Sequence, residues 1–364
     1  MIQDKQRFPA FSDTPLSVLD EQGNWTADFA CDLDPDLLVS LYKKMLGARL
    51  MDERFLRLQR MGKMSFTAPL AGHEGAQIAA AAALIPGKDW YFPYYRDYGA
   101  TYALGVPLNE IFAQVMGAKS DPAKSRQMPM HPHSKALNIF TTVSAIAAHI
   151  PPAVGAALSM KFRNTGEVAL TSFGDGATSE GDFHAALNFA GVQAAPVVFL
   201  CENNRYAISV GFEQQSGSAT VAEKAHAYGM PGYLVDGMDV LACYYVLREA
   251  VAQARNGLGS SLIDAQVYRY GPHSSADDDS HYRSQEEKDI WAKRDPLERL
   301  KTYLSGRGLW SDEQGAELKD ELNQSFANAI RTAEEAGKAP VEWMLEDVFK
   351  EMPPHLVEQK EFLK

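Results

Sequence analysis

The sequence predicts an α/β fold: a mainly parallel sheet flanked by helices, with an N-terminal arm and a helical C-terminal tail. Two apolar, β-prone runs, 167–173 and 197–201, are separated by a glycine turn and a helical pattern. A strand–helix–strand crossover of this kind is right-handed and returns parallel. With 364 residues, 46% of them apolar, the chain can also bury a core of more than one layer.

The first strand of this crossover leads into Gly174-Asp175-Gly176, a turn that only small residues permit. We expect Thr178 or Ser179 to cap the following helix, because Ser179 and Asp182 have the spacing of a capping box. The helix then presents an apolar face at helical spacing, made of Phe183, Ala186, Leu187 and Ala190.

The second strand of the crossover closes on Glu202-Asn203-Asn204. Since parallel strands end at the same edge of a sheet, Asp175 and the two asparagines should lie side by side there. Open α/β sheets bind their ligands at this edge.

The remaining elements divide the chain into three predicted parts. An arm over 1–35 lies on the rest of the chain or on a partner, an α/β domain spans 36–284, and a helical region over 285–364 packs on that domain. Within the domain we expect helices at 36–60, 75–84, 109–116 and 146–160, strands at 233–235 and 262–268, and a polar loop at 271–283. The last of these helices lies in an alanine-rich, buried segment, 146–162, that Pro151-Pro152 interrupts. The first helix has an apolar face of Leu37, Leu38, Leu41, Leu46, Met51, Phe55 and Leu58.

Composition excludes several classes of function. The net charge of −12, without a basic tract, argues against nucleic acid or an anionic membrane as a partner. The cysteines, Cys31, Cys201 and Cys243, lack the spacing of a zinc site or a disulfide framework. The N-terminus has no apolar signal region, and no apolar run reaches membrane-spanning length. We therefore expect a cytoplasmic protein.

The predicted sheet edge carries the ligands that magnesium prefers. Asp175 offers a carboxylate and Asn204 an amide oxygen, and a backbone carbonyl after Asn204 can add a third oxygen. The amides of Gly174 and Gly176 and the next helix N-terminus favour phosphates. These features predict a magnesium-bridged diphosphate. A dinucleotide is excluded, because no G-x-G-x-x-G follows a strand.

A GDG followed after a strand–helix–strand unit by NN resembles the thiamine-diphosphate motif. GDG alone is a common turn, and the crossover and the terminal ENN make the resemblance specific. Over nearly its whole length the chain resembles the α subunit of the 2-oxo acid dehydrogenase decarboxylase component, which implies the thiamine-diphosphate-binding fold. The segments that carry this resemblance are FPYYRD at 92–97, SRQMPMH at 125–131, GDGATSEGDFH at 174–184, ENNRYAIS at 202–209, VDGMD at 235–239 and YRYGPHS at 268–274.

Within that family the chain looks most like the branched-chain 2-oxoisovalerate dehydrogenase type. The pointers are SEGD at 179–182, YAIS at 206–209, HSS at 273–275 with its following aspartates, and EDVFKEMP at 346–353. Relatives of this type often carry a potassium loop, but the stretch 143–149 has few oxygen donors, which argues against that site here. Ser274 stands where mitochondrial relatives are phosphorylated, and the sequence does not show that a kinase exists for this protein.

The resemblance implies a set of cofactor residues. The magnesium ligands would be Asp175, Asn204 and the Tyr206 carbonyl. The diphosphate would be held by Tyr95, Arg96, Lys224 and His273, with Gly174, Gly176 and Ala177 also against the cofactor. A guanidinium suits this role because it pairs bidentately with phosphate oxygens. The alternatives are a surface ion pair between Arg96 and Asp97, and a solvated helix lysine at 224.

Further residues are implied around the reacting end of the cofactor. Ser144 and Ile146 match the strip that meets the aminopyrimidine ring; the alternative for both is ordinary core, and Ile146 should be core in either case. Phe66 and His131 would line the acyl pocket, and His131 and His273 would be the catalytic histidines. His131 and His133 form an H-x-H pair without a third metal ligand nearby in sequence. His149 and His184 lie on expected helices and are interpreted as structural.

The implied activity is oxidative decarboxylation of a branched-chain 2-oxo acid, with transfer of the acyl group to the lipoamide of a lipoyl-bearing dihydrolipoyl acyltransferase. Pyruvate or acetoin remains the alternative substrate. A non-catalytic, thiamine-diphosphate-binding assembly subunit is the alternative from another class. No acid here is placed by motif against the aminopyrimidine. In the family that glutamate comes from a separate β subunit, so the resemblance implies an α2β2 assembly.

Overall fold

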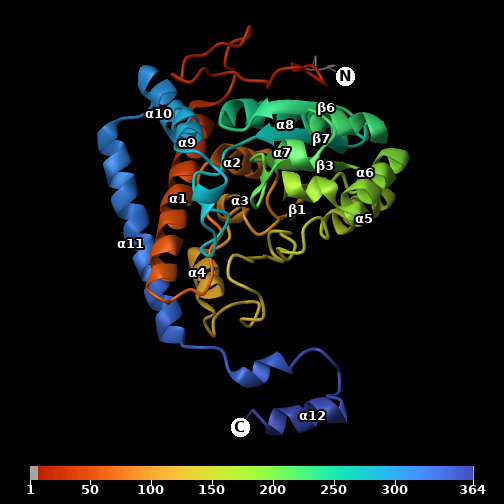
Figure 1. Cartoon of the computed structure of the whole chain (residues 1–364), viewed down its shortest axis with the longest axis vertical. Coiled ribbons are helices and arrows are strands. Elements are labelled where there is room, and N and C mark those ends of the chain that lie inside the picture. Colours follow the sequence, from red (N-terminus) through yellow and green to blue (C-terminus); the bar gives the residue numbers. More distant parts are fainter. Residues whose placement is uncertain (1–6, 364) are drawn as a thin grey trace.

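The computed structural model describes residues 7–363 and is built around a five-stranded parallel sheet (Figure 1). The strands lie in the order β1-β2-β3-β7-β6. Their bounds are Trp90–Phe92, Ala169–Gly174, Val197–Asn203, Ser261–Gln266 and Gly232–Asp236 for β1, β2, β3, β7 and β6. In the central pairs, Gly174 lies opposite Glu202, and Asn203 lies opposite Gln266. The predicted parallel sheet is confirmed, and its carboxyl ends form one edge.

Helices cover both faces of the sheet, and β3 shows why. Its alternate side chains enter two different cores: Val198 and Leu200 join one, and Val197, Phe199 and Cys201 the other. The first core lies under α2 (Glu74–Ala83) and α8 (Val240–Arg255), and the second under α5 (Ile150–Arg163) and α6 (Gly181–Gln193). A strand buried on both faces reads as a continuous apolar run, which is how this one appears in the sequence.

The crossover from β2 to β3 has the predicted helix, but the predicted cap is wrong. Residues Asp175–Ser179 form a separate 3₁₀ turn, η1, and α6 begins two residues later behind Glu180 without a side-chain cap. Ser179 instead donates its hydroxyl to the carbonyl of Gln215, 3.3 Å away, and the buried Thr178 hydroxyl has no hydrogen-bond partner among residues 7–363. The apolar face of α6 is buried as expected.

The helix expected over 146–160 starts four residues late, at Ile150. Pro151 and Pro152 stand in the first turn of α5, where proline needs no hydrogen-bond partner for its missing N–H. They therefore begin the helix rather than interrupt it. Ile146 is left in the preceding loop with 45% of its surface exposed, so the expectation that it is core is wrong.

The other predicted elements are present within a residue or two. They are α1 (Pro35–Arg60), whose predicted face is buried or partly buried, α2, α4 (Leu108–Met116), β6 and β7. The elements we did not predict are β1, α3 (Tyr98–Ala103) and α8, together with short pieces after β3: β4 (Tyr206–Ala207), β5 (Val210–Gly211), α7 (Phe212–Gln215) and η2 (Ala222–Tyr228).

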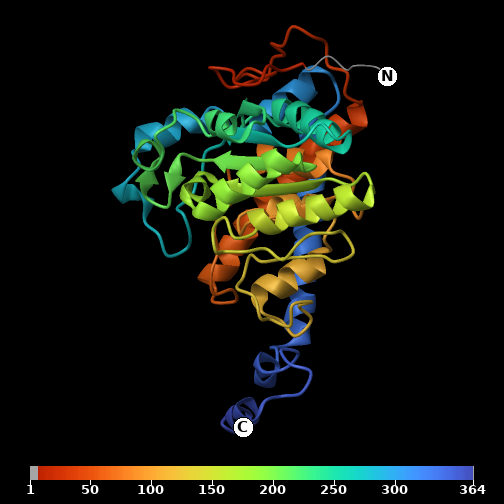
Figure 2. The ribbon, with the colours of Figure 1, turned by 90° about the vertical axis from the view of Figure 1, so that its right-hand side faces the viewer.

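The C-terminal region is helical, as predicted. It contains α9 (Gln285–Ala292), α10 (Pro296–Gly306), α11 (Asp312–Ala336), η4 (Val341–Met344) and α12 (Pro354–Glu361). A short 3₁₀ turn that was not predicted, η3 (Asp279–His281), lies before it, inside the loop expected over 271–283. Helix α11 runs beside α1 and packs on α4, and the segment after it extends away from the sheet and ends in α12 (Figures 1 and 2). The boundaries of the three parts at 35 and 284 remain a prediction.

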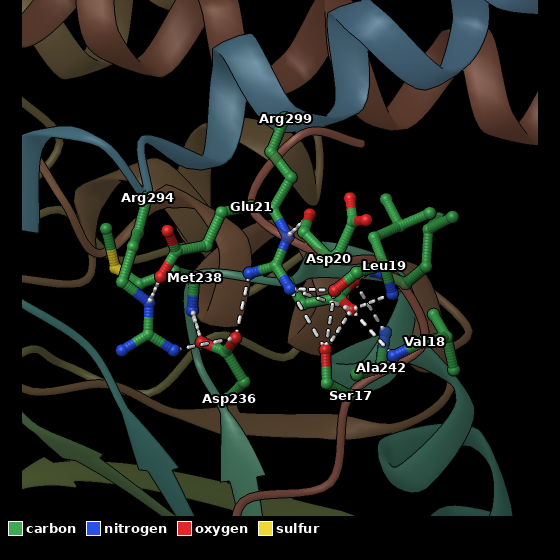
Figure 3. Close-up of polar contacts among 12 residues, drawn as sticks. Ser17, Val18, Leu19, Asp20, Glu21, Asp236, Met238, Ala242, Arg294 and Arg299 are labelled. Carbon is green, nitrogen blue, oxygen red and sulfur yellow. Dashed lines mark hydrogen bonds and ion pairs between the residues drawn. The ribbon is translucent and has the colours of Figure 1, made fainter. Parts of the chain in front are cut away.

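The part of the arm that the structure describes lies against β6, α8 and α10; residues 1–6 of the predicted arm lie outside the described residues. Arg299 of α10 reaches across to Asp236 at the end of β6 with a 2.8 Å bond, and it also donates to Ser17 Oγ and to the carbonyls of Leu19 and Asp20 (Figure 3). The Asp239 carboxylate caps α8 and accepts the amides of Val18 and Leu19.

Candidate active site at the carboxyl edge of the sheet

A cavity of about 490 Å³ opens at the carboxyl ends of β2 and β3. All but two of the site residues predicted from the sequence line it. From the strand ends and the loops around them come Phe66, Tyr95, Arg96, Ser144, Ile146, Gly174, Asp175, Gly176, Ala177, Asn204, Tyr206 and His273. The predicted neighbours Asp175 and Asn204 therefore face one space, as the crossover argument required.

Asp175 is the one acid among the described residues that line this cavity. It is 1% exposed, and burial raises the pKa of its carboxyl to about 6. One oxygen, Oδ2, accepts the Gln215 side-chain amide at 2.7 Å. The other, Oδ1, is buried and has no partner among the described residues. A buried carboxylate oxygen without a donor is suited to a cation.

The loop after β3 supplies the other oxygens. The Asn204 amide oxygen accepts the backbone N–H of Tyr206 at 3.2 Å, and Arg205 between them has a φ of +66°, which is uncommon outside glycine. Asn203 stabilises this turn, because its side-chain oxygen accepts the Arg205 N–H while its amide donates to Asp264 Oδ1, both at 3.0 Å. Fully buried Asp264 thus braces the loop from β7.

Gly176 of the turn packs closely against the chain that follows β3. A Cβ on Gly176 would lie 3.0 Å from the Cβ of Ala207, in β4 after the Asn204 loop. The turn and the loop are therefore in close contact, which the small residue permits. This contact explains the glycine at 176, whereas a Cβ on Gly174 would come no closer than 3.9 Å to its nearest neighbour, Tyr94.

Two buried guanidinium groups flank the cavity. Arg96 and Arg269 are each 1% exposed, and no carboxylate among the described residues lies within ion-pair distance of either. Arg96 donates to the Pro69 carbonyl, and Arg269 to the Ile208 carbonyl at 3.0 Å. Burial, together with the charge of Arg96, lowers the pKa of Arg269 to about 10. Buried charge without a counter-charge is costly, so this pair is suited to a polyanion. The alternative of a surface ion pair between Arg96 and Asp97 is not found.

His273 lies between these two arginines. Its Nδ1 is 3.3 Å from Arg96 Nη2 and 3.4 Å from Arg269 Nη1, so Nδ1 is the acceptor and the ring proton is on Nε2. Burial and the two guanidinium charges lower the pKa of His273 to about 3. The imidazole is therefore neutral at physiological pH and can donate a hydrogen bond from Nε2.

His131 lies behind the cavity wall rather than on it. It is 3% exposed and receives the hydroxyl proton of Ser144, which does line the cavity, at Nε2 over 2.7 Å. The ring N–H at Nδ1 donates to the Pro129 carbonyl at 2.9 Å, which fixes the tautomer. Burial lowers the pKa of His131. The His131 ring is therefore linked to the cavity through its hydrogen bond with the Ser144 hydroxyl.

Glu202, the acid that precedes the two asparagines, is not at the cavity surface. It is fully buried and accepts bonds from His73 Nδ1 at 2.7 Å, from Gln77 at 3.0 Å and from the Tyr94 hydroxyl at 3.2 Å. The Tyr94 ring lines the cavity, so this buried cluster supports its wall.

Lys224 is the predicted residue that the structure places elsewhere. It lies in η2 and is not among the lining residues. Sequence reasoning also missed five lining residues: Tyr94, Met128, Ala207, Ile208 and Arg269. Arg269 could have been found, because it follows the predicted strand at 262–268 and so reaches the same sheet edge.

Other predicted roles can be compared with the structure. His149 precedes α5, is buried, and contacts the Ser172 carbonyl through Nε2, while His184 contacts the Tyr228 hydroxyl. The structural role expected for the two histidines stays a prediction, and His149 lies before its helix rather than on it. Among residues 7–363, no group of three or more His, Cys, Asp or Glu side chains could hold a metal. The H-x-H pair therefore gains no third ligand within the described chain.

Comparison with known proteins agrees with this geometry. Residues 42–342 match the model of the family described as dehydrogenase E1 component. The chain belongs to the dehydrogenase E1 component family. It is 41% identical over 98% of its length to 2-oxoisovalerate dehydrogenase subunit alpha 2, mitochondrial, of Arabidopsis thaliana, covering 75% of that protein. It is also 38% identical to the pyruvate dehydrogenase E1 component subunit alpha of Staphylococcus aureus (strain Mu50), over 96% of this chain and 92% of the relative.

The chain is accordingly the α subunit of the E1 component of a 2-oxo acid dehydrogenase. E1 dehydrogenases bind thiamine diphosphate with a divalent metal, typically Mg²⁺. Their α subunits form α2β2 assemblies with a β subunit and pass the acyl group to a lipoyl-bearing acyltransferase. In the part of the chain that the structure describes, no helix has the length and apolar character needed to span a membrane.

Proposed function

We propose that this E1 α subunit acts on a branched-chain 2-oxo acid of the 3-methyl-2-oxobutanoate type. One observation supports the cofactor site. Two buried guanidinium groups without a carboxylate partner, those of Arg96 and Arg269, line the same cavity as Asp175, whose Oδ1 has no hydrogen-bond donor among the described residues. A diphosphate bridged to a divalent cation satisfies both sides at once.

In this proposal Asp175, Asn204 and the Tyr206 carbonyl hold the metal, and Arg96, Tyr95 and His273 hold the diphosphate. We add Arg269 to the diphosphate set because it is buried beside Arg96 without a counter-charge. Lys224 is withdrawn from that set, since it does not line the cavity. The amides of Gly174, Gly176 and Ala177 complete the phosphate end.

The reacting end of the cavity is proposed to lie at the remaining lining residues, Ser144, Ile146 and Phe66. Thiamine diphosphate supplies the carbanion and the electron sink that decarboxylation requires. The chain's own residues would position the reacting groups: neutral His273 can donate a hydrogen bond from Nε2, and neutral His131 accepts the Ser144 hydroxyl proton and so orients the Ser144 oxygen in the cavity wall, where it can accept a proton. Phe66, Met128, Ile146 and Ile208 give the cavity apolar walls.

Branched-chain specificity is supported by this apolar lining and by two Arabidopsis thaliana 2-oxoisovalerate dehydrogenase α subunits, at 41% and 40% identity. Pyruvate is the second candidate, favoured by the Staphylococcus aureus relatives at 38% identity. Acetoin has no such support. An assembly subunit without catalytic function is disfavoured, because Asp175, Asn204 and His273 all face the cavity.

The deciding experiment is carbon dioxide release from a panel of 2-oxo acids by the chain assembled with its β subunit. We expect the highest kcat/KM for 3-methyl-2-oxobutanoate, and a higher value for pyruvate would reverse the assignment. We also propose a cytoplasmic location, which the three free cysteines suit because free thiols persist in reducing compartments.

A further inference from the structure

Gln215 is held against the candidate metal ligand by the short helix α7. Its Nε2 donates to Asp175 Oδ2 at 2.7 Å, and its backbone carbonyl accepts the Ser179 hydroxyl at 3.3 Å. The helix itself is anchored, since Phe212 is 4% exposed and its N–H donates to the Arg205 carbonyl at 2.9 Å. One short element is therefore bonded both to the GDG turn and to the loop after Asn204.

This arrangement decides which Asp175 oxygen is free. With Oδ2 occupied by the amide, only the buried Oδ1 lacks a donor. A carboxylate that binds a metal through one oxygen needs its second oxygen hydrogen-bonded, or the side chain can rotate out of position. An amide does this without neutralising the carboxylate. A lysine or arginine in its place would compete with the cation for the same negative charge.

We propose that Gln215 is a positioning residue for the metal site: its amide fixes the Asp175 carboxylate so that Oδ1 faces the cation. This inference rests on the proposed assignment of Asp175 as a metal ligand. It extends that assignment to a residue 40 positions away that no sequence motif marked. Gln215 is not among the residues that line the cavity, so its proposed action is through Asp175.

The test uses the assembled α2β2 enzyme and the Gln215→Met variant, which keeps the length of the side chain but cannot donate. Gln214→Ala is the matched control, because Gln214 is the preceding, exposed residue of the same helix. The first readout is calorimetric binding of thiamine diphosphate as a function of Mg²⁺ concentration. The second is kcat at saturating Mg²⁺, and the third is the thermal unfolding midpoint.

We expect Gln215→Met to raise the Mg²⁺ concentration for half-maximal cofactor binding by about 10- to 100-fold. At saturating Mg²⁺ its kcat should stay within about twofold of the natural enzyme, because the ligand itself is intact. The Gln214→Ala control should match the natural enzyme in all three readouts. A Gln215→Met enzyme with unchanged Mg²⁺ dependence would overturn the proposal, as would a loss of stability without a change in that dependence.

The Asp175→Ala variant distinguishes failure of the positioning role of Gln215 from failure of the metal-ligand assignment of Asp175. If Asp175→Ala loses Mg²⁺-dependent binding while Gln215→Met does not, the positioning role alone is wrong. If Asp175→Ala leaves the Mg²⁺ dependence unchanged, the metal assignment itself fails. Should Gln215→Met not assemble, Gln215→Glu keeps the side-chain shape and sets a like charge against Oδ2. Like Gln215→Met, it should raise the Mg²⁺ concentration needed for half-maximal cofactor binding. An unchanged concentration would refute the positioning role.

Discussion

At the scale of single residues, the Asp175 carboxylate concentrates the negative charge of the cavity in one buried group. We predict that Asp175→Ala weakens Mg²⁺-dependent binding of thiamine diphosphate by more than about 100-fold, because the metal loses its charged ligand. The fold should persist, since burial already disfavours this charge, as the raised pKa of about 6 shows. Calorimetry in magnesium buffer measures the binding, and unchanged affinity would remove Asp175 from the metal site.

His273 should matter more for turnover than for stability. It contacts two arginines at the cavity but lies on a polar loop with little apolar packing. We expect His273→Ala to lower kcat by about 100-fold or more, the range for a lost hydrogen-bond donor to charge that develops in the transition state. The thermal unfolding midpoint should fall only slightly. His281→Ala, in an exposed position of the same loop, is the control and should keep full turnover.

The lowered pKa of His273 also predicts a pH effect on stability. Its folded-state pKa of about 3 lies below the usual value of 6.5. Between these two pH values the His273 side chain is protonated in the unfolded chain but not in the folded chain. Above pH 6.5 the titration of His273 therefore does not reduce the stability of the folded chain. As the pH falls from 6.5 toward 3, the folding equilibrium constant decreases by up to about tenfold per pH unit. His273→Gln lacks this proton uptake.

The measurement is urea unfolding of the natural chain and of His273→Gln between pH 7.5 and pH 5.5. The natural chain should lose more stability across this range than the variant does. A constant difference between the two would mean that His273 titrates normally in the folded state.

At the scale of elements, Asp264 links β7 to the loop that carries Asn204. It accepts the Asn203 amide and, through Oδ2, the Val221 N–H at 2.7 Å. We predict that Asp264→Asn lowers the free energy of unfolding by about 1–3 kcal/mol, since an amide cannot accept both bonds. It should also raise the Mg²⁺ concentration needed for half-maximal cofactor binding by about tenfold. Denaturant unfolding and Mg²⁺ titration measure the two effects, and a stability loss alone would confine Asp264 to a structural role.

The loop over 271–283 is the second element tied to the cavity. Asp277 in this loop accepts the His273 N–H at 2.7 Å and the Tyr282 hydroxyl, and Arg283 donates to the carbonyls of Arg269 and Gly271. An anion that binds Arg269 and His273 therefore also stabilises the loop. We expect limited proteolysis within 271–283 to slow when thiamine diphosphate and Mg²⁺ are added. Digestion at the same rate would show that the loop does not respond to the diphosphate.

The sequence was sufficient for elements whose pattern is local. The buried runs of β2 and β3, the face of α6 and the meeting of Asp175 and Asn204 at the strand ends follow from periodicity and from the geometry of a parallel crossover. The start of α5 was mistaken because two prolines read equally as a break or as a first turn. Gln215 could not be predicted, because its contact with Asp175 depends on the path of a hairpin and a four-residue helix.

At the scale of the whole molecule, the active site should require a second chain. Asp175 is the one acid among the described cavity residues, and its proposed role is metal binding, which leaves no carboxylate for the aminopyrimidine. We predict that the purified chain releases no carbon dioxide from 2-oxo acids, and that activity appears with its β subunit in an α2β2 assembly. Activity and solution mass with and without the β chain provide the measurement. Full turnover by this chain alone would refute the two-chain site.

The contacts of Arg299 with the arm also have a consequence for how the chain is made. Arg299 bonds to Ser17 and Leu19, about 280 positions earlier, so these contacts close one of the longest loops in the chain. Contacts of such high sequence separation form late, because the entropy of closing the loop must be met first. During synthesis the arm emerges before α10 and can complete its docking only after α10 has been translated. Until then Trp25, whose ring packs against Tyr303 of α10 at a centroid distance of 5.9 Å, lacks part of its cover and is open to contact with other nascent chains.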